Sequence, residues 1–246
     1  MLLFYIRHGD PIYTPDSLTP LGEEQAKAVA SRLALFGVDE IYSSPSNRAI
    51  LTAKYTCELL GKQPRILDFL NENALGGMKI PRTDRKHDWV WSDSEYANIL
   101  AERSVREMGD RWYDHPKFEQ FHFDRTILPI NDQIDAFLSS CGYEHDREKG
   151  LYNVIGNHTE KRIAIFAHEC MGKIFMSHVL DIPFPYYAAH FEMHTSALTV
   201  IRFGSSDAVE NERCVRAQVL SLSNDSHLYK DEVSLVHRFT HIRERY

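Results

Sequence analysis

The stretch LLFYIRHGD, residues 2–10, joins a run of apolar residues to an arginine, a histidine, a glycine and an aspartate. An unbroken apolar run is typical of a central strand that is buried on both faces of a sheet. Arg7, His8 and Gly9 stand where this strand would end. The stretch therefore predicts a rigid buried strand that carries a cation and an imidazole at its tip.

Strands and helices alternate along the rest of the chain. Residues 11–20 contain three prolines and are predicted to form a loop. Thr19 suits the N-cap of a helix, Pro20 its first position, and Gly37 its end. Further strands are predicted at 39–43, 65–70, 162–167, 198–203 and 217–222, and further helices from Pro45 to Gly61 and over 170–180. This alternation predicts a layered α/β fold with a mostly parallel sheet.

Residues from about 78 to 150 differ from the rest of the chain in composition and periodicity. They hold Trp89, Trp91 and Trp112 among many charged residues, with only local helical periodicity. We expect a largely helical insertion within a single domain, 1–246, that shapes access of the substrate. The tryptophans are expected to fill the core of the insertion, although they could line a pocket instead.

Composition limits the classes of function. The chain has 246 residues, 43% of them hydrophobic, and a formal net charge of −7, which argues against binding to nucleic acid or acidic lipid. No apolar run reaches the length of a membrane span, and the N-terminal run is too short for a signal peptide. We therefore expect a cytoplasmic protein. Its four scattered cysteines are expected to be reduced.

Three predicted strands end in residues that can carry chemistry. Arg7, His8 and Gly9 follow the first strand, SSPSNR (43–48) follows the second, and His168 with Glu169 follows the strand at 162–167. Ligands of parallel α/β sheets gather at the carboxyl ends of the strands, so these side chains are predicted to meet in one site.

The residue types in this predicted site suit a phosphoryl group. Arg7 and Arg48 are planar donors for phosphate or carboxylate oxygens, and Arg48 falls in the first turn of a helix, where the dipole also favours an anion. His8 and His168 could each act as nucleophile, acid, base or donor. Two histidines beside two arginines make a poor metal site, so no metal or organic cofactor is expected. Taken singly, each residue could instead be a surface ion-pair partner or a core histidine, and only their shared position favours a site.

Five blocks of the sequence also resemble the histidine phosphatase superfamily, the group that includes cofactor-dependent phosphoglycerate mutases. They are FYIRHGDPIYTPDSLTPLGEEQA, YSSPSNRAILTA (42–53), LNENALGG (70–77), IAIFAHECMGKIF (163–175) and NDSHL (224–228). They occur in family order and leave only the 78–150 segment without a counterpart. The resemblance implies a three-layer α/β/α sandwich of the phosphoglycerate mutase type.

The resemblance also implies roles for individual residues. His8 would be the nucleophile that becomes phosphorylated, Arg7 and Arg48 would bind the phosphoryl oxygens, His168 would donate to the same group, and Glu72 would be the proton donor. A neutral imidazole must attack phosphorus, and neighbouring arginines lower the pKa of a histidine in the required direction. The implied function is a phosphomonoesterase that needs no metal and acts on a small phosphate ester.

The chain departs from the family pattern in several places. Pro11 and Thr14 stand where the family often has Thr or Ser and then Asn, so one phosphate contact is lost; we group Gly9, Thr14 and Glu169 with the substrate-binding residues. Glu169 is the alternative to Glu72 as the acid. The missing mutase-type opening makes a phosphoglycerate mutase the second choice, and a non-catalytic phosphate-binding protein is a third. A homodimer is possible.

Other polar groups have plainer interpretations. Arg82, Arg85, Lys86 and His87 could bind a second anionic group, but such a run is more often a solvated face. His122, His145 and His158 are too dispersed in the sequence to suggest a metal site.

Overall fold

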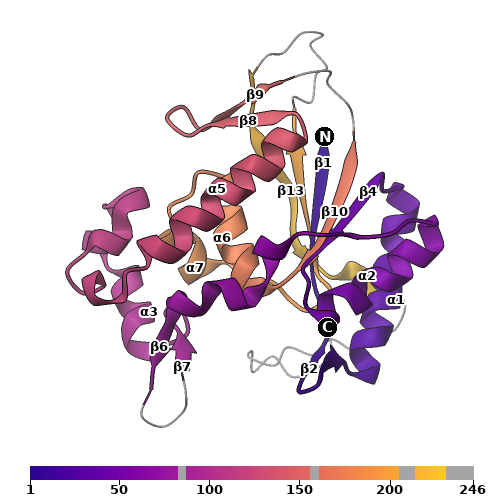
Figure 1. Cartoon of the computed structure of the whole chain (residues 1–246), viewed down its shortest axis with the longest axis horizontal. Coiled ribbons are helices and arrows are strands. Elements are labelled where there is room, and N and C mark those ends of the chain that lie inside the picture. Colours follow the sequence, from indigo (N-terminus) through magenta and orange to yellow (C-terminus); the bar gives the residue numbers. More distant parts are fainter. Residues whose placement is uncertain (83–86, 156–160, 205–213, 231–246) are drawn as a thin grey trace.

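The protein is built around a six-stranded sheet in the strand order β13-β11-β1-β10-β4-β5 (Figure 1). The computed structural model describes residues 1–82, 87–155, 161–204 and 214–230. The strands are β1 (Leu2–Arg7), β4 (Glu40–Ser43), β5 (Arg65–Ile66), β10 (Arg162–Ala167), β11 (Leu198–Phe203) and β13 (Ala217–Asn224). The neighbouring strands β1, β10, β4 and β5 run parallel to one another. β11 runs antiparallel to both of its neighbours, β1 and β13. The predicted mostly parallel sheet is confirmed.

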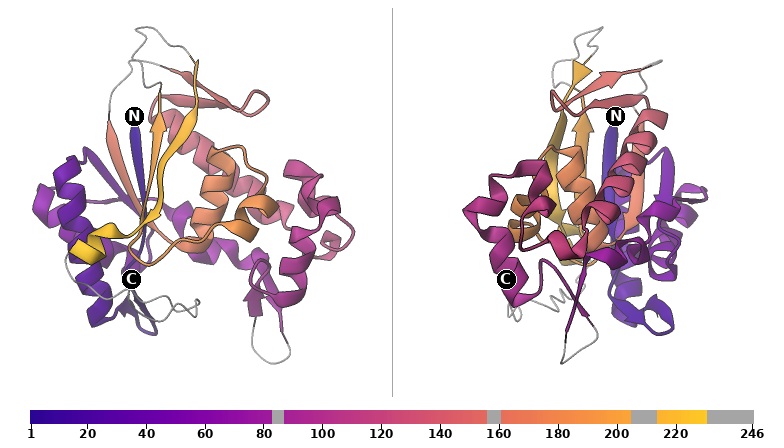
Figure 2. Two further views of the ribbon diagram at one scale, coloured as in Figure 1. Left: turned by 180° about the vertical axis from the view of Figure 1, so that it is seen from behind. Right: turned by 60° about the vertical axis from the view of Figure 1, so that its left-hand side comes forward.

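Helices cover both faces of this sheet (Figures 1 and 2). On one face lie α1 (Pro20–Phe36) and α2 (Asn47–Leu60), and on the other lie α5 (Asp124–Ser140), α6 (Glu169–Val179) and α7 (Phe184–His190). Successive side chains of a strand point to opposite faces. Accordingly Phe4 and Ile6 pack in the core beneath α1 and α2, whereas Leu3 and Tyr5 pack in the core beneath α5 and α6. The sandwich of three layers is as expected.

The predicted ends of α1 are also confirmed. Thr19 caps the helix by accepting a hydrogen bond from the backbone N–H of Gly22, Pro20 is its first residue, and Gly37 closes it with φ 70°. The second helix starts slightly later than predicted, at Asn47 rather than Pro45, and ends at Gly61 as expected. Ser46 is its N-cap but makes no side-chain cap bond.

The segment from about 78 to 150 is mainly helical but is bordered by two hairpins. It contains β6 (Lys79–Pro81), β7 (His87–Trp89), α3 (Ser94–Ala101), α4 (Arg103–Arg106), the 3₁₀ helices η3 (Gly109–Asp114) and η4 (Glu119–Phe121), α5, and β8 (Tyr143–Asp146). β8 pairs with β9 (Leu151–Val154), which in turn pairs with β12 (Cys214–Val215). Trp112 is buried against Phe118 and Phe184, so this tryptophan belongs to the core.

Two predicted segments have a different structure. The loop expected over 11–20 contains a small hairpin of β2 (Pro11–Tyr13) and β3 (Asp16–Leu18). Pro11 is tolerated there because it is the first residue of a strand, where its missing N–H breaks no ladder bond. The strand expected over 65–70 stops at Ile66 and continues as the 3₁₀ helices η1 (Asp68–Leu70) and η2 (Glu72–Met78). The elements α7, β9 and the final short helix α8 (Ser226–Lys230) were not expected from the sequence.

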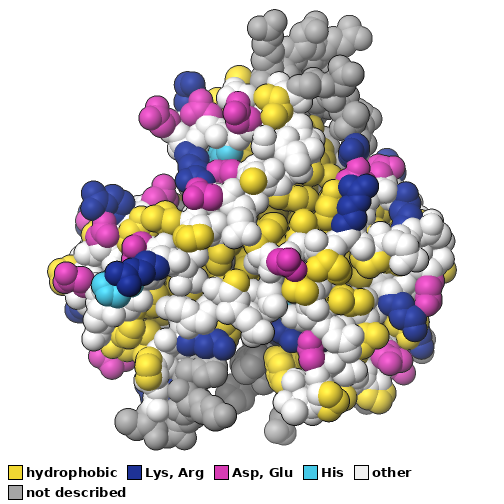
Figure 3. Space-filling view, in the orientation of Figure 1, with side chains coloured by type: hydrophobic (Ala, Val, Ile, Leu, Met, Phe, Trp, Pro, Cys, Tyr) yellow, Lys and Arg dark blue, Asp and Glu magenta, His cyan; other side chains and the backbone are white. Residues whose placement is uncertain are grey.

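The surface carries charges of both signs. Figure 3 shows lysines and arginines interspersed with aspartates and glutamates over the face of Figure 1, with hydrophobic side chains between α5 and β4. Within the ranges that the structure describes, no helix combines the length and the apolar character needed to cross a membrane. All four cysteines are free thiols, as predicted.

Candidate active site

The register of the sheet brings the predicted strand ends together. Arg7 of β1 lies opposite Ala167 of β10, and Phe166 of β10 lies opposite Ser43 of β4. Beyond these pairs, the backbone N–H of His8 donates to the carbonyl of Ala167 at 2.9 Å, and that of Ser44 donates to Phe166 at 2.9 Å. The residues after three neighbouring strands therefore meet at one edge of the sheet.

His8 is buried and its tautomer is determined by its own neighbour. Nδ1 of His8 lies 2.7 Å from the carbonyl oxygen of Gly9. A carbonyl can only accept, so Nδ1 must carry the proton. The lone pair of a neutral ring is then on Nε2, which has no hydrogen-bond partner among the described residues. Nε2 is the atom available for attack.

His168 is the N-cap of α6 and is held from both sides. Its Nδ1 lies 3.0 Å from Nη2 of Arg48, and its Nε2 lies 2.8 Å from the hydroxyl of Ser44. Because a guanidinium can only donate, Nδ1 accepts and the proton of the neutral ring is on Nε2. The ring centroids of His8 and His168 are 5.2 Å apart.

Both imidazoles are held in the neutral form. Burial makes the largest contribution to lowering the pKa of His8 well below 6.5, and His168, Arg7 and Arg48 lower that pKa further. Burial likewise lowers the pKa of His168, with Arg48 and Arg7 adding to the effect. The arginines lower the pKa of both histidines, as expected, and desolvation lowers it in the same direction by a larger amount.

The two arginines of the site are each paired with different carboxylates. Nη1 of Arg7 lies 2.5 Å from Oε2 of Glu169 and donates to the carbonyl of Met193. Arg48 pairs through Nη1 with Asp16 and through Nη2 with Glu72, each at 2.9 Å. The Nε–H groups of both arginines are buried and have no partner among the described residues. Each arginine thus retains a donor that an anion could accept from.

Two carboxyl groups border the site. Glu72, the first residue of η2, places Oε2 2.9 Å from Arg48 and 4.0 Å from Nδ1 of His168. Glu169, the first residue of α6, lies beside Arg7. Burial raises the pKa of Glu169 to about 7, against the attraction of Arg7, and a hydrogen bond with Glu192 raises it further. Lys173, with a fully buried side chain, lies 3.1 Å from Glu192 and 3.8 Å from Glu169.

Gly9 is required by packing as well as by any ligand. A Cβ at position 9 would lie 2.5 Å from the carbonyl oxygen of Gly22 in α1, and a Cβ on Gly22 would lie 2.2 Å from the carbonyl oxygen of Asp10. The pair lets the tip of β1 lie directly against the first turn of α1. The backbone N–H of Gly9 also donates to the hydroxyl of Thr52 in α2 at 3.0 Å.

The residues that follow Gly9 in the sequence point mainly toward the start of α1 and the β2–β3 turn. Asp10 accepts a hydrogen bond from the hydroxyl of Thr19 at 2.8 Å, so its carboxylate faces the start of α1. Thr14 is exposed in the turn between β2 and β3, and within the described part of the chain it makes no hydrogen bond to His8, Arg7 or Arg48. The adjacent Tyr13 instead places its ring 5.5 Å from the guanidinium of Arg48.

Some polar residues of the site were not predicted. They are Ser44 on His168, Asp16 on Arg48, and Lys173 and Glu192 beside Glu169. Ser44 lies within the strand-end block 43–48 that was predicted to reach the site, but no role was predicted for it; it follows β4 as His8 follows β1. Glu192 lies in a segment with no strand or helix signal, so only the fold places it.

The predicted basic run is only partly described. Arg82 pairs with Asp93 at 2.6 Å, while Arg85 and Lys86 lie outside the described residues, as does His158. Of His87 only the backbone, in β7, is described.

Comparison with known proteins identifies the family. The sequence profile of the histidine phosphatase superfamily (branch 1) matches residues 3–115. "Putative phosphoserine phosphatase 2" of Hydrogenobacter thermophilus is 33% identical over 152 residues, which are 58% of this chain and 68% of that protein. The chain belongs to the histidine phosphatase superfamily. A second protein of that organism, phosphoserine phosphatase 1, is 23% identical over 58% of this chain and 65% of its own length.

Solved structures of similar fold span nearly the whole chain. Phosphoserine phosphatase from Entamoeba histolytica, in complex with 3-phosphoglyceric acid, has a TM-score of 0.59 and 20% identity over 92% of this chain and 98% of that one. A mycobacterial glucosyl-3-phosphoglycerate phosphatase with inorganic phosphate has a TM-score of 0.57 and 17% identity over 92% and 98%. At this identity they show the fold alone. The family membership and the curated relatives identify this histidine phosphatase as an enzyme.

Proposed function

We propose that this histidine phosphatase is a phosphomonoesterase that needs no metal and works through a phosphohistidine at His8. The observation that supports this most directly is the bond from Nδ1 of His8 to the carbonyl of Gly9. It leaves Nε2 as an unprotonated nucleophile that needs no base to activate it. Its lowered pKa keeps it neutral at physiological pH.

The proposed reaction has two displacements. Arg7 and Arg48 bind the phosphoryl oxygens, Nε2 of His8 attacks phosphorus, and the bond to the ester oxygen breaks. Glu72 donates its proton to the leaving oxygen, which departs as an alcohol. Glu72, now a carboxylate, then takes a proton from water, whose oxygen attacks phosphorus and releases inorganic phosphate from His8.

His168 has a conditional role in this scheme. In the ligand-free arrangement its Nδ1 accepts from Arg48, so it cannot donate to a phosphoryl oxygen from that atom. We propose that Arg48 turns to the bound phosphoryl group and that His168 then changes tautomer: its one proton leaves Nε2 and, through solvent, occupies Nδ1, while Nε2 accepts a hydrogen bond from the hydroxyl of Ser44. His168 would thereby stabilise the charge that develops on the phosphoryl oxygens.

The proposed substrate is a small phosphate ester. Two relatives in Hydrogenobacter thermophilus bear the name phosphoserine phosphatase, and a protein of the same fold was solved with 3-phosphoglyceric acid. Phosphoserine and phosphorylated sugar acids are therefore the first compounds to assay, followed by other metabolite phosphates. Inorganic phosphate should accumulate in amounts equal to the alcohol, whereas a mutase would move the phosphoryl group within the substrate.

The mechanism is tested by trapping the phosphoenzyme. During turnover of a ³²P-labelled substrate, quenching in detergent at alkaline pH should leave label on the wild-type protein and none on His8→Ala. The label should be stable to base and released by acid, as expected for phosphohistidine. Exposed His190, at the end of α7, offers a matched control, and His190→Ala should trap label normally. A chelator should leave the initial rate unchanged. Turnover without any adduct at His8 would refute the mechanism.

The assignment of the acid is tested separately. Glu72→Gln keeps an oxygen for Arg48 but cannot give up a proton, so kcat on an alkyl phosphate should fall about 10²–10⁴-fold. The loss should be much smaller on nitrophenyl phosphate, whose leaving group needs no proton. Glu169→Gln should show no such dependence on the leaving group. The reverse pattern would make Glu169 the acid.

A further inference from the structure

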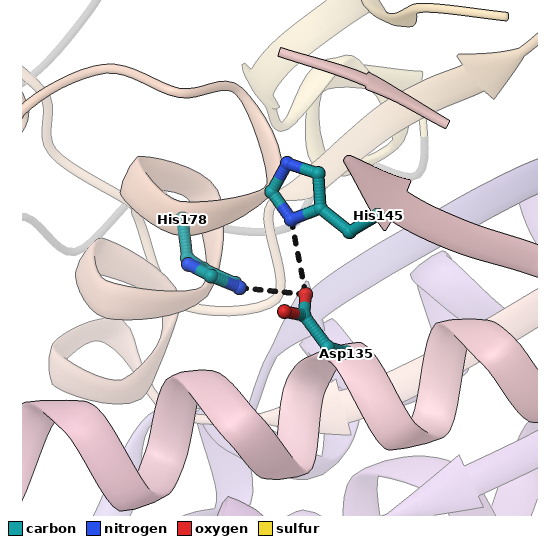
Figure 4. Close-up of side chains that lie close together, drawn as sticks. All are labelled: Asp135, His145 and His178. Atoms are coloured by element: carbon teal, nitrogen blue, oxygen red, sulfur yellow. Dashed lines mark hydrogen bonds and ion pairs between the residues drawn. The ribbon is translucent and has the colours of Figure 1, made fainter. Parts of the chain in front are cut away.

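A cluster of two histidines and an aspartate lies outside the proposed active site. Asp135 of α5, His145 of β8 and His178 of α6 point toward one another in Figure 4. Oδ1 of Asp135 lies 3.0 Å from Nδ1 of His145 and 2.7 Å from Nε2 of His178. One ligand atom from each residue falls within 4.8 Å of the others.

The two rings are held rigidly in place. The side chains of His145 and His178 are only 1% and 8% exposed. The ring of His145 stacks on Tyr152 with centroids 4.4 Å apart and an angle of 12°. Neither histidine has a described role in the phosphate site, so the burial of this cluster needs its own explanation.

The charges around the cluster favour a cation. Asp135, Asp181 and Asp132 contribute three carboxylates, and in the described part of the chain they pair with Arg147 and with the two histidines, His145 and His178. As metal ligands both imidazoles would be neutral, and Arg147 would then be the one positive charge among these partners. Arg147 occupies Oδ2 of Asp135 at 2.7 Å, which leaves Oδ1 facing the histidines. A divalent ion would bring this group of charges to neutrality.

We propose that Nδ1 of His145, Nε2 of His178 and Oδ1 of Asp135 bind one divalent metal ion of the zinc type. Imidazole and carboxylate donors suit Zn²⁺, whose bonds of about 2.0–2.1 Å set neighbouring ligand atoms roughly 3 Å apart. The observed separations are close to this value, so the side chains need little movement. Sulfur is absent from the donor set, which argues against a site for Cu⁺.

The surroundings also supply the outer contacts that zinc sites use. The far nitrogen of His145, Nε2, lies 3.2 Å from a carboxylate oxygen of Asp181, an arrangement that orients a ligating histidine. A cavity of about 110 Å³ borders the cluster, with His178, Asp181 and Arg147 in its wall. Water in this cavity can complete the coordination.

The site is separate from the phosphoryl chemistry. His178 lies ten residues after His168, and at about 1.5 Å per residue it is roughly 15 Å along α6 from the proposed active site. An ion there cannot touch the reacting phosphorus. It would join α5, β8 and α6, so its expected role is structural, and it is compatible with metal-independent catalysis.

Titration of chelator-treated protein with Zn²⁺ tests the proposal. Calorimetry should find one ion per chain in the wild type, and Zn²⁺ should raise Tm. His178→Ala and Asp135→Asn should lose this ion, and Asp181→Asn, which keeps the shape of the side chain, should weaken binding about 10-fold. Co²⁺ in place of Zn²⁺ should give visible absorption in the wild type and none in His178→Ala or Asp135→Asn.

Two controls separate this site from other histidines. His8→Ala should bind Zn²⁺ as the wild type does, which distinguishes the cluster from the active-site pair, and His190→Ala should also be unaffected. No Zn²⁺-dependent rise in Tm of the wild type, or equal binding by wild type, His178→Ala and Asp135→Asn, would overturn the proposal. In that case the cluster is a hydrogen-bonded network alone. The result does not depend on phosphatase activity.

Discussion

At the scale of single residues, the main feature of the site is a pair of buried histidines whose imidazole rings stay neutral. His8 and His168 are removed from water and face each other and two arginines, so protonating either one is costly. The same neutral state that the proposed attack by His8 requires makes the folded state sensitive to acid. Function and stability are thus linked through the same rings.

The first prediction follows from the lowered pKa values of these rings. The unfolded chain binds protons near pH 6.5 while the folded chain does not, so their contribution to stability is complete above pH 6.5 and is lost as pH falls. Each histidine should contribute a slope of up to about 1.4 kcal/mol per pH unit. Urea unfolding between pH 7.5 and 5.5 should show a shallower decline for His8→Asn than for the wild type. His190→Asn is the control and should decline as the wild type does; equal slopes in all three would contradict the argument.

The second prediction concerns the tight contact between β1 and α1. Gly9→Ala forces a methyl group to within 2.5 Å of the backbone of Gly22, so we expect a loss of about 2 kcal/mol in the free energy of unfolding. Activity should fall too, because the carbonyl of Gly9 holds Nδ1 of His8. Gly76→Ala is a matched control, since a Cβ there meets nothing within 4 Å. A Gly9→Ala protein as stable as Gly76→Ala would show that the contact is easily relaxed.

The starts of two helices position the site at the scale of elements. The first turn of α1 holds Asp10 through Thr19, and the first turn of α2 carries Arg48. The two helix starts are capped differently: Thr19 makes a side-chain cap bond, while Ser46 makes none. Comparing the two helix starts therefore measures how much a side-chain cap bond contributes to the stability of this protein.

Replacing each cap residue should reveal this difference. Thr19→Ala removes the bond to Gly22 and the bond to Asp10 and should cost about 1 kcal/mol or more of folding stability. Ser46→Ala should lower the folding stability by only a few tenths of the loss expected for Thr19→Ala, because Ser46 makes no side-chain cap bond. Parallel urea titrations measure both. The prediction fails if the two substitutions destabilise the protein equally.

The hydrophobic core joins the sheet to the predicted insertion at the scale of the whole molecule. The larger core cluster contains Tyr5 of β1 together with Trp112 and Phe137 of the 78–150 segment. Tyr42 of β4 packs edge-on against Phe137 of α5, with ring centroids 5.1 Å apart. That the chain behaves as one domain remains a prediction, and this shared core is its physical basis.

Unfolding probed in two ways tests that prediction. All three tryptophans lie in the 78–150 segment, so their fluorescence reports on it, whereas far-UV circular dichroism reports on the whole chain. The two transitions should coincide. Phe137→Ala should shift both together by about 3 kcal/mol. Separate transitions, or a shift in fluorescence alone, would mean that the segment unfolds independently.

Much of this molecule could be predicted from local patterns in the sequence. Unbroken apolar runs indicated β1, β10 and β11, and Thr19, Pro20 and Gly37 marked the ends of α1. The convergence of His8, Arg48 and His168 followed from their place after parallel strands. These features depend on residue type and spacing along the chain, which local physics is enough to interpret.

Only the tertiary structure decided the contacts between distant residues. It placed Glu169 beside Glu192, brought Asp16 to Arg48, and gathered Asp135, His145 and His178 into one cluster. Each of these depends on how separate elements pack, since the residues involved carry no common periodicity. The sequence by itself determined the buried strands, the ends of α1 and the candidate site residues that follow the strands; the packing of the three layers determined which charges surround them.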